Sequence, residues 1–411
     1  MPDRSPPSPP TRSRRAFVRD ALVAGSAAAA SPAALADAAP PAAPPTAAVP
    51  TLPGVNEAVA EFVTDGRLAG AVTLVADRDG LRHVGAVGRS DIDADRPMTA
   101  DALFWIASMT KPVTGAAVMM LVDEGTLRLA DTIATYVPEF AGLVDPAGAP
   151  AAITLEQALT HTSGLGDVPR QQAQQAASLA ELLPQCLAQP LKFTPGTKWA
   201  YCQTGINAAA RVVEIVAGEP FHEFLEKRLF GPLGMRDTGF FPDDARCARL
   251  ATTYRISPSE RRLVPDKPGL DVTNRRRAAL ANGGLFSTAP DYARFAQMLL
   301  GRGALDGRRY LSESAVATLA ADHTGPLAAG FVPGSCWGVA TAVVREPQGV
   351  TATLSPGSFG HGGAHGTQAW IDPVRGVAQI LLFLRSDIGD SDGSPMRERF
   401  HAAVARALGW T

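Results

Sequence analysis

Residues typical of β-strands gather near both ends of this chain, and residues typical of helices fill the stretch between them. Two apolar runs, 70–76 and 81–88, flank an Asp-Gly turn and predict an antiparallel hairpin. Helical patterns follow at 108–124, 155–159, 179–188, 206–217 and 221–229. Strand patterns return at 337–344, 368–371 and 377–384, before an amphipathic helix at about 396–408. This order predicts an α+β fold: one antiparallel sheet from the N- and C-terminal segments, flanked by helices, with a mostly helical middle lobe and a site between the two parts.

The composition is that of a globular protein. With 411 residues, 46% of them hydrophobic and 19% charged, the chain has enough apolar material for a large core. Length alone would allow two or three domains, and we expect one folded unit over 54–411. A net charge of −2 provides no basic field for nucleic acid. No apolar run reaches the roughly 18 residues that span a bilayer, so we expect no stable membrane anchor.

The first 36 residues resemble a twin-arginine export signal. Arg14 and Arg15 are followed by Phe17, a weakly apolar run at 21–30 and the small-residue site Ala34-Leu35-Ala36. A disordered basic tail is the alternative. Residues 37–53 are mostly Ala and Pro and read as an extended linker. These features predict a periplasmic or secreted protein whose partner during export is the twin-arginine machinery.

The four cysteines, Cys186, Cys202, Cys247 and Cys336, are scattered without a C-x-x-C pair. Three complete disulfide pairings are possible, and we expect free buried thiols because a domain of this size does not need stapling. No H-E-x-x-H, Walker-type or G-x-S-x-G motif is present, so no metal ligands, nucleotide site or nucleophile elbow are predicted.

A first candidate for chemistry is Ser108-Met109-Thr110-Lys111. Serine and lysine three residues apart on a helix share one face, and an amine in apolar surroundings can serve as the base of a serine nucleophile. Only five of the 38 cationic residues are lysines, and only Lys111 has a serine three positions earlier. A helix-start serine beside a solvated lysine is the plain alternative for this motif alone.

Two further candidates follow along the chain. Tyr201-Cys202-Gln203 supplies a phenol, which can act as a phenolate beside an ammonium or can relay a proton. The segment 359–367 contains His361 and His365 among glycines, which let backbone approach a ligand closely and can present an N–H to an oxyanion. A structural tyrosine and a tight turn with incidental histidines are the respective alternatives.

Taken together, S-x-x-K, a tyrosine motif about 90 residues later and His-x-Gly before a late strand resemble the serine β-lactamase and penicillin-binding protein superfamily. The order is most similar to the class C β-lactamase-related group, which includes family VIII carboxylesterases, D-amino-acid peptidases and acyltransferases. The resemblance covers about 54–410 and is supported by the stretches 159–165, 195–196, 232–235 and 283–288.

The resemblance implies a role for each motif. Ser108 would be the acylated nucleophile, Lys111 its base and Tyr201 the proton relay to the leaving group. Backbone N–H groups of Ser108 and Ala364 would form the oxyanion hole. No metal or organic cofactor would be required.

Two departures from the family's pattern bear on the substrate. Gln203 stands where many relatives have asparagine, and His361-Gly362-Gly363 stands where β-lactamases have Lys-Thr-Gly, so a permanent cation for a substrate carboxylate is missing. We therefore expect a small neutral ester or amide as substrate, and above all an exported carboxylesterase with weak or no β-lactamase activity, with His361, Gly363 and Gln203 in the substrate site.

Other functions remain open at this point. A D-amino-acid peptidase, an acyltransferase or a non-catalytic penicillin- or peptidoglycan-binding protein would carry the same three motifs. We expect His161 to be structural, and His365 is left open between a place at the pocket rim and none. The sequence indicates no oligomeric state.

Overall fold

The computed structural model describes residues 51–389 and 392–410. The predicted export signal and the linker up to residue 50 lie outside these residues, and both stay predictions. Among the helices within the described ranges, none is both long enough and apolar enough to cross a membrane.

The core of the structure is an eight-stranded sheet in the order β10-β11-β12-β13-β14-β1-β2-β3, with every neighbouring pair antiparallel. Its strands are β1 (Gly70–Asp77), β2 (Leu81–Asp91), β3 (Arg96–Pro97), β10 (Ser335–Trp337), β11 (Ala342–Val344), β12 (Phe359–Gly362), β13 (Gln368–Asp372) and β14 (Val377–Leu382). Three two-stranded ribbons are β4 (Phe104–Trp105) with β7 (Phe286–Ser287), β5 (Tyr254–Ile256) with β6 (Leu263–Pro265), and β8 (Ala304–Leu305) with β9 (Arg308–Arg309). The predicted union of N- and C-terminal strands is therefore confirmed, since Val72 of β1 pairs with Leu382 of β14.

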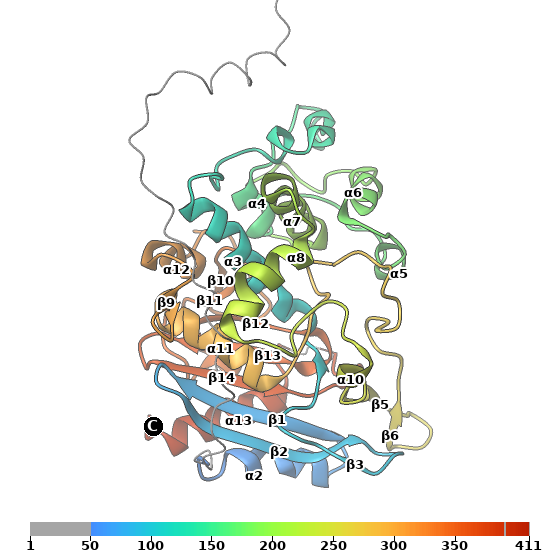
Figure 1. The fold of residues 1–411 in the computed structure, drawn as a ribbon, viewed down its shortest axis with the longest axis vertical. Coiled ribbons are helices and arrows are strands. Elements are labelled where there is room, and N and C mark those ends of the chain that lie inside the picture. Colours follow the sequence, from blue (N-terminus) through green and yellow to red (C-terminus); the bar gives the residue numbers. More distant parts are fainter. Residues whose placement is uncertain (1–50, 390–391, 411) are drawn as a thin grey trace, which may run out of the picture. The chain divides into compact units, whose positions relative to one another are not determined.

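The helices cover both faces of this sheet and build the lobe beyond it (Figure 1). They are α2 (Val55–Thr64), α3 (Thr110–Asp123), α4 (Leu155–Leu159), α5 (Arg170–Ala173), α6 (Leu179–Leu187), α7 (Gln203–Ala217), α8 (Phe221–Leu225), α9 (Gly231–Leu233), α10 (Asp244–Cys247), α11 (Ala289–Leu300), α12 (Glu313–Ala320) and α13 (Pro395–Ala407). Short 3-10 turns are η1 (Ala107–Met109), η2 (Ile133–Thr135), η3 (Pro138–Gly142), η5 (Gly349–Thr351) and η6 (Ala364–Gly366), and η4 (Glu226–Phe230) is a π-helical turn.

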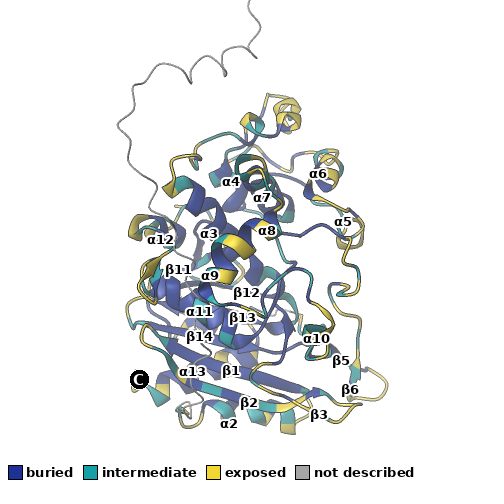
Figure 2. Ribbon diagram, viewed as in Figure 1, coloured by how far each residue is buried: buried dark blue, intermediate teal, exposed yellow. Residues whose placement is uncertain are grey.

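Strand β1 shows how the sequence separates the two faces. Ala71 and Val75 point to the face covered by α2 and α13, and Val72 and Leu74 point to the opposite face, because side chains alternate along a strand. All four are fully buried, so both faces of β1 are core (Figure 2). A strand covered on both sides reads as a continuous apolar run, as this one does.

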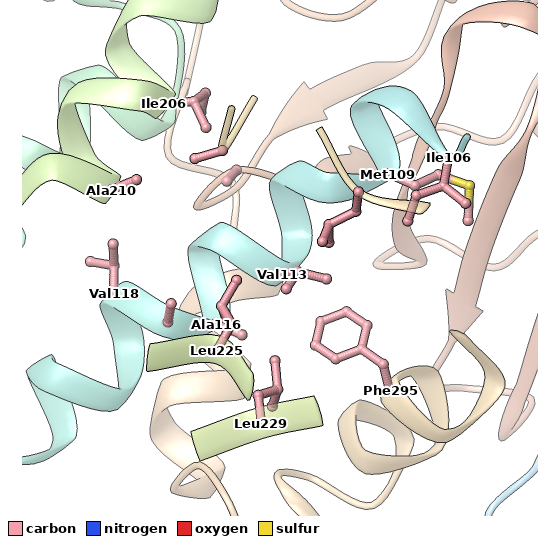
Figure 3. Close-up of a cluster of buried hydrophobic side chains, with 14 of the residues drawn as sticks. Ile106, Met109, Val113, Ala116, Val118, Ile206, Ala210, Leu225, Leu229 and Phe295 are labelled. Atoms are coloured by element: carbon pink, nitrogen blue, oxygen red, sulfur yellow. The ribbon is translucent and has the colours of Figure 1, made fainter. Parts of the chain in front are cut away.

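Helix α3 runs through the centre of the helical lobe and is buried on all sides from Thr110 to Leu121. Figure 3 shows its apolar side chains, with Val113 and Val118 among them, between α7 and Phe295 of α11. A helix that is apolar all round is typical of a core position. The rigid surroundings of α3 fix the place of Ser108 and Lys111 at its N-terminal end.

The α+β prediction is confirmed, and several element predictions need correction. The single strand predicted at 337–344 is two strands, β10 and β11, because the chain turns at 338–341, where Ala340 has a φ of +58°. Helices α2, α11 and α12 were missed. The segment around His361 is strand β12 rather than a turn, and Gln203 begins α7 rather than preceding it.

All four cysteines are free thiols, as expected. Three of them are buried, and Cys247 is half-buried, which corrects the expectation that all four lie in the core.

Candidate active site

Ser108 lies in η1, directly before α3, where the preceding Ala107 adopts the left-handed conformation with a φ of +47°. One helical turn later, Lys111 is fully buried and its Nζ lies 3.2 Å from Ser108 Oγ. The expected shared face of the S-x-x-K motif is therefore present. Left-handed backbone at a non-glycine residue carries strain, which is common beside reactive groups.

Two carbonyl oxygens hold the Lys111 amine. Nζ donates to Gln203 Oε1 at 2.9 Å and to the Asn282 carbonyl oxygen at 2.6 Å. A neutral amine has two N–H bonds and one lone pair, so these two acceptors take both hydrogens and the lone pair faces Ser108 Oγ. This is the orientation that a general base for Ser108 requires.

The charge state of Lys111 fits the same role. Burial without full hydration lowers the pKa of Lys111 to about 7, and the Asp167 carboxylate opposes this by favouring the ammonium. About half of the lysine is then neutral at pH 7. An ordinary surface lysine would be almost entirely protonated there.

Tyr201 and His361 lie on the other side of Lys111, whose Nζ is 4.6 Å from the centre of the Tyr201 ring. Burial, and after it the charge on Lys111, lowers the pKa of His361 to about 3, so the ring is neutral at pH 7. Its Nδ1 contacts the Gly362 carbonyl oxygen, which can only accept, so Nδ1 carries the hydrogen and Nε2 is an acceptor. The Tyr201 hydroxyl, 3.4 Å from Nε2, therefore donates to His361.

The Tyr201 phenol stays protonated. Burial raises its pKa well above the ordinary value, and an interaction with the Ser108 side chain only partly opposes this. Of the two roles that the sequence left open, this favours the neutral relay over the resting phenolate. His161 packs on the Tyr201 ring at 4.5 Å between centres, and its Nδ1 accepts the Cys202 N–H, so His161 supports the tyrosine loop as a structural residue.

Gln203 has a different surrounding from the one expected. Its Oε1 accepts hydrogen bonds from Lys111 and from Asn282 Nδ2, at 2.9 Å each. Asn207 Oδ1 in turn accepts the Asn282 N–H. Gln203 thus holds the base, although it also lines the cavity beside Ser108. Asn282 and Asn207 were missed by sequence reasoning, although Asn282 directly precedes the Gly283-Gly284 stretch.

Asp167 is a second missed residue. Its carboxylate accepts the N–H groups of Gln203 and Thr204 at 2.9 and 2.8 Å and the Thr204 hydroxyl at 2.8 Å, so it caps the N-terminus of α7 from another part of the chain. Nothing in the local sequence signals this contact, because capping residues are ordinarily adjacent to the helix they cap.

The backbone N–H groups of Ser108 and Ala364 both face the same cavity wall. Within the described ranges neither N–H donates to a protein acceptor. Gly363 makes their approach possible, because a Cβ there would lie 2.5 Å from the Ile106 carbonyl oxygen. Two unused N–H donors beside a serine nucleophile are what an oxyanion hole requires.

A cavity of about 270 Å³ opens beside Ser108. Its walls are mostly apolar, with Asp167, Arg170 and the amides described above as polar groups; the apolar side chains are Trp105, Val168, Ala173, Leu182, Leu270 and Leu280. His365 does not line this cavity and packs on Trp105 instead, at 5.1 Å between ring centres. In the described part of the chain, no group of three or more His, Cys, Asp or Glu side chains could hold a metal ion.

An α+β fold with serine, lysine and tyrosine gathered between an antiparallel sheet and a helical lobe defines the class of serine β-lactamases and penicillin-binding proteins. A family model described as Beta-lactamase matches residues 55–403, and this chain belongs to that family. The resemblance predicted from the motifs is thereby confirmed.

Three similar proteins place the chain within the family. Protein Rv1367c of Mycobacterium tuberculosis (strain ATCC 25618 / H37Rv) is 38% identical over 362 residues, covering 81% of this chain and 89% of the relative. Esterase EstB of Burkholderia gladioli is 29% identical over 346 residues, covering 77% and 86%. The solved structure of EstCE1, "a hydrolase with promiscuous acyltransferase activity", has a TM-score of 0.72 at 23% identity and covers 85% of this chain and 97% of its own.

Proposed function

We propose that this protein is a serine hydrolase that cleaves small neutral carboxylic esters through an acyl-Ser108 intermediate. The observation that carries the proposal is the Lys111 amine, 3.2 Å from Ser108 Oγ with its two hydrogens taken by fixed carbonyl oxygens. The family includes an esterase among the similar proteins, which supports the reaction class.

The reaction runs in two stages. Lys111 removes the Ser108 proton as Oγ bonds to the ester carbonyl carbon, and the N–H groups of Ser108 and Ala364 stabilise the resulting oxyanion. Collapse breaks the bond to the leaving alcohol, which receives a proton from Lys111 by way of the Tyr201 hydroxyl. Water, activated by the same groups, then attacks the acyl-Ser108 ester and releases the acid.

The surroundings favour an uncharged substrate. His361 is buried and neutral where antibiotic-hydrolysing relatives carry a lysine, so that position offers no cation to a carboxylate-bearing β-lactam. The apolar cavity suits an acyl chain instead. At about 30 Å³ per water-sized group, 270 Å³ holds an acyl chain of roughly four to eight carbons.

The test compares p-nitrophenyl butyrate hydrolysis by the wild type, Ser108→Ala and Ser314→Ala, the last a matched exposed serine on α12. We expect Ser108→Ala to lose at least about 10³-fold in kcat/KM, Ser314→Ala to match the wild type, and mass spectrometry to find a butyryl group on Ser108. Equal rates in the wild type and Ser108→Ala would contradict the proposal.

The same mass measurement separates the remaining candidates. A penicilloyl adduct that persists without any ester turnover would identify a penicillin-binding protein, and faster cleavage of D-alanyl-D-alanine peptides than of esters would identify a peptidase. Butyl transfer to added alcohol in preference to water would identify an acyltransferase.

A further inference from the structure

The connection between β12 and β13, which carries Ala364, is held from behind by the C-terminal helix. Arg397 of α13 donates from Nη2 to the carbonyl oxygens of Thr367 at 2.6 Å and Gly363 at 3.2 Å, and from Nε to that of Gly366 at 3.5 Å. Its side chain is only 2% exposed. A single guanidinium therefore binds three carbonyl oxygens of one short loop, which its planar fork of donors makes possible.

This loop has an irregular backbone that needs such support. His365 has a φ of +68° and Gly366 a φ of +113°, so the loop does not follow a regular turn. On its opposite side Thr367 Oγ1 donates to the Ile106 carbonyl oxygen at 3.2 Å, two residues before Ser108. The loop is thus clamped between α13 and the segment that carries the nucleophile.

The charge of Arg397 is balanced by Asp392, which pairs with Nη1. Gly362 leaves room for this ion pair, because a Cβ at Gly362 would lie 2.0 Å from Asp392 Oδ1 and 2.5 Å from Arg397 Nη1. A buried arginine without a partner would be strongly destabilising. The glycine of the third motif therefore serves the arginine as well as the substrate side of the strand.

One contact links Arg397 to the oxyanion hole directly. The Gly363 carbonyl that accepts from Arg397 and the Ala364 N–H belong to the same peptide unit, which is trans. In a trans peptide the C=O and N–H bonds point in opposite directions. Fixing the oxygen toward α13 therefore fixes the Ala364 N–H toward Ser108, and a cation at the oxygen polarises the peptide so that its N–H becomes a stronger donor.

We infer that Arg397 is a positioning residue of the oxyanion hole, which orients and polarises the Ala364 N–H, with Asp392 holding the guanidinium in place. The inference rests on the proposed acyl-Ser108 chemistry. It concerns a residue that does not touch the substrate and acts through the peptide unit between Gly363 and Ala364.

The test compares Arg397→Met and Arg397→Lys with Arg399→Met, an exposed arginine two residues further along the same helix that pairs with Glu61. Two quantities are measured: kcat and KM for p-nitrophenyl butyrate, and the inhibition constant of phenylboronic acid, whose tetrahedral adduct with a serine mimics the oxyanion. A structural role alone would not weaken boronate binding and kcat by matching factors while it leaves KM unchanged.

We expect Arg397→Met to lower kcat about 10- to 100-fold and to weaken phenylboronic acid by a similar factor, with KM changed less than about threefold. Arg397→Lys should recover only part of the loss, because an ammonium cannot bind three carbonyl oxygens as a fork does. Arg399→Met should match the wild type. Asp392→Asn should give a smaller loss of the same kind, and it tests the inference if Arg397→Met does not fold.

Three results would overturn the inference. In the first, Arg397→Met matches Arg399→Met; in the second, Arg397→Met raises KM at unchanged kcat; in the third, kcat falls while boronate affinity stays. Where only Asp392→Asn folds, wild-type kcat and boronate affinity in that variant would overturn it too. A wild type that neither hydrolyses the ester nor binds the boronate would instead contradict the proposed function, so the two failures are distinguishable.

Discussion

At the scale of single residues, the site depends on how Lys111 is surrounded. Its two hydrogens are directed to Gln203 and Asn282, and burial brings its pKa to about 7. The amine must be neutral to accept the Ser108 proton, and a lysine is neutral above its pKa. The environment thus makes a base from a residue that is ordinarily an acid at this pH.

A pH profile checks this directly. We expect kcat/KM for p-nitrophenyl butyrate to rise with pH through a midpoint near 7 and to level off above it, because the fraction of neutral Lys111 rises in that range. Lys111→Arg should lose at least about 10³-fold at every pH, since a guanidinium does not release its proton. Lys227→Arg, an exposed lysine, is the control. A profile that falls between pH 6 and 8 would contradict the role of Lys111.

At the scale of elements, the N-terminus of α7 connects the helical lobe with the base. The Asp167 carboxylate caps this terminus and at the same time favours the charged form of Lys111. One side chain from outside the helix therefore affects both the stability of α7 and the pKa of the base.

Asp167→Asn separates these effects. We expect the variant to lose about 1–2 kcal/mol in the free energy of unfolding, because an amide is a weaker cap than a carboxylate here. The midpoint of the pH profile should move below that of the wild type, because the charge that favours the ammonium is gone. Asp243→Asn, at the exposed N-cap of α10, should leave the midpoint unchanged. A midpoint that rises in Asp167→Asn would contradict the coupling.

The elements also show how far the sequence could predict this structure. The hairpin of β1 and β2 and the three motifs were predictable because their signals are local patterns. Helix α11 was missed although its signals are present, with Thr288 as N-cap and a proline in the first turn. Asp167 and Asn282 had no such signal, because tertiary contacts bring them to the site. Likewise, the turn at 338–341 has no Asn-Gly or Pro to mark it.

At the scale of the whole molecule, buried histidines make the fold sensitive to acid. Burial lowers the pKa of five histidines below the ordinary value near 6.5, to about 3 for His361 and His401 and to about 4 for His365. The five are His83, His161, His361, His365 and His401. Between those values and 6.5 the unfolded chain binds protons that the folded chain does not, so stability falls as pH falls. Asp291, whose pKa burial raises to about 6, acts in the opposite direction as a single group.

Urea unfolding at pH 7.5, 6.5 and 5.5 tests this. We expect the free energy of unfolding to fall below about pH 6.5, with each buried histidine contributing up to about 1.4 kcal/mol per pH unit. His401→Gln should reduce the slope, whereas the exposed His222→Gln should not. An unfolding free energy that stays level from pH 7.5 to 5.5 would show that these histidines are not held neutral.

The pairing of β1 with β14 also has a consequence for synthesis on the ribosome. Val72 and its partner Leu382 are separated by about 300 residues, which at roughly 5–20 residues per second take about 15 to 60 s to translate. During that interval the nascent chain has β1 and β2 but not the strand that completes the centre of the sheet, so one edge of β1 stays open. Chaperones that cover exposed strand edges would act on this chain until its last segment emerges.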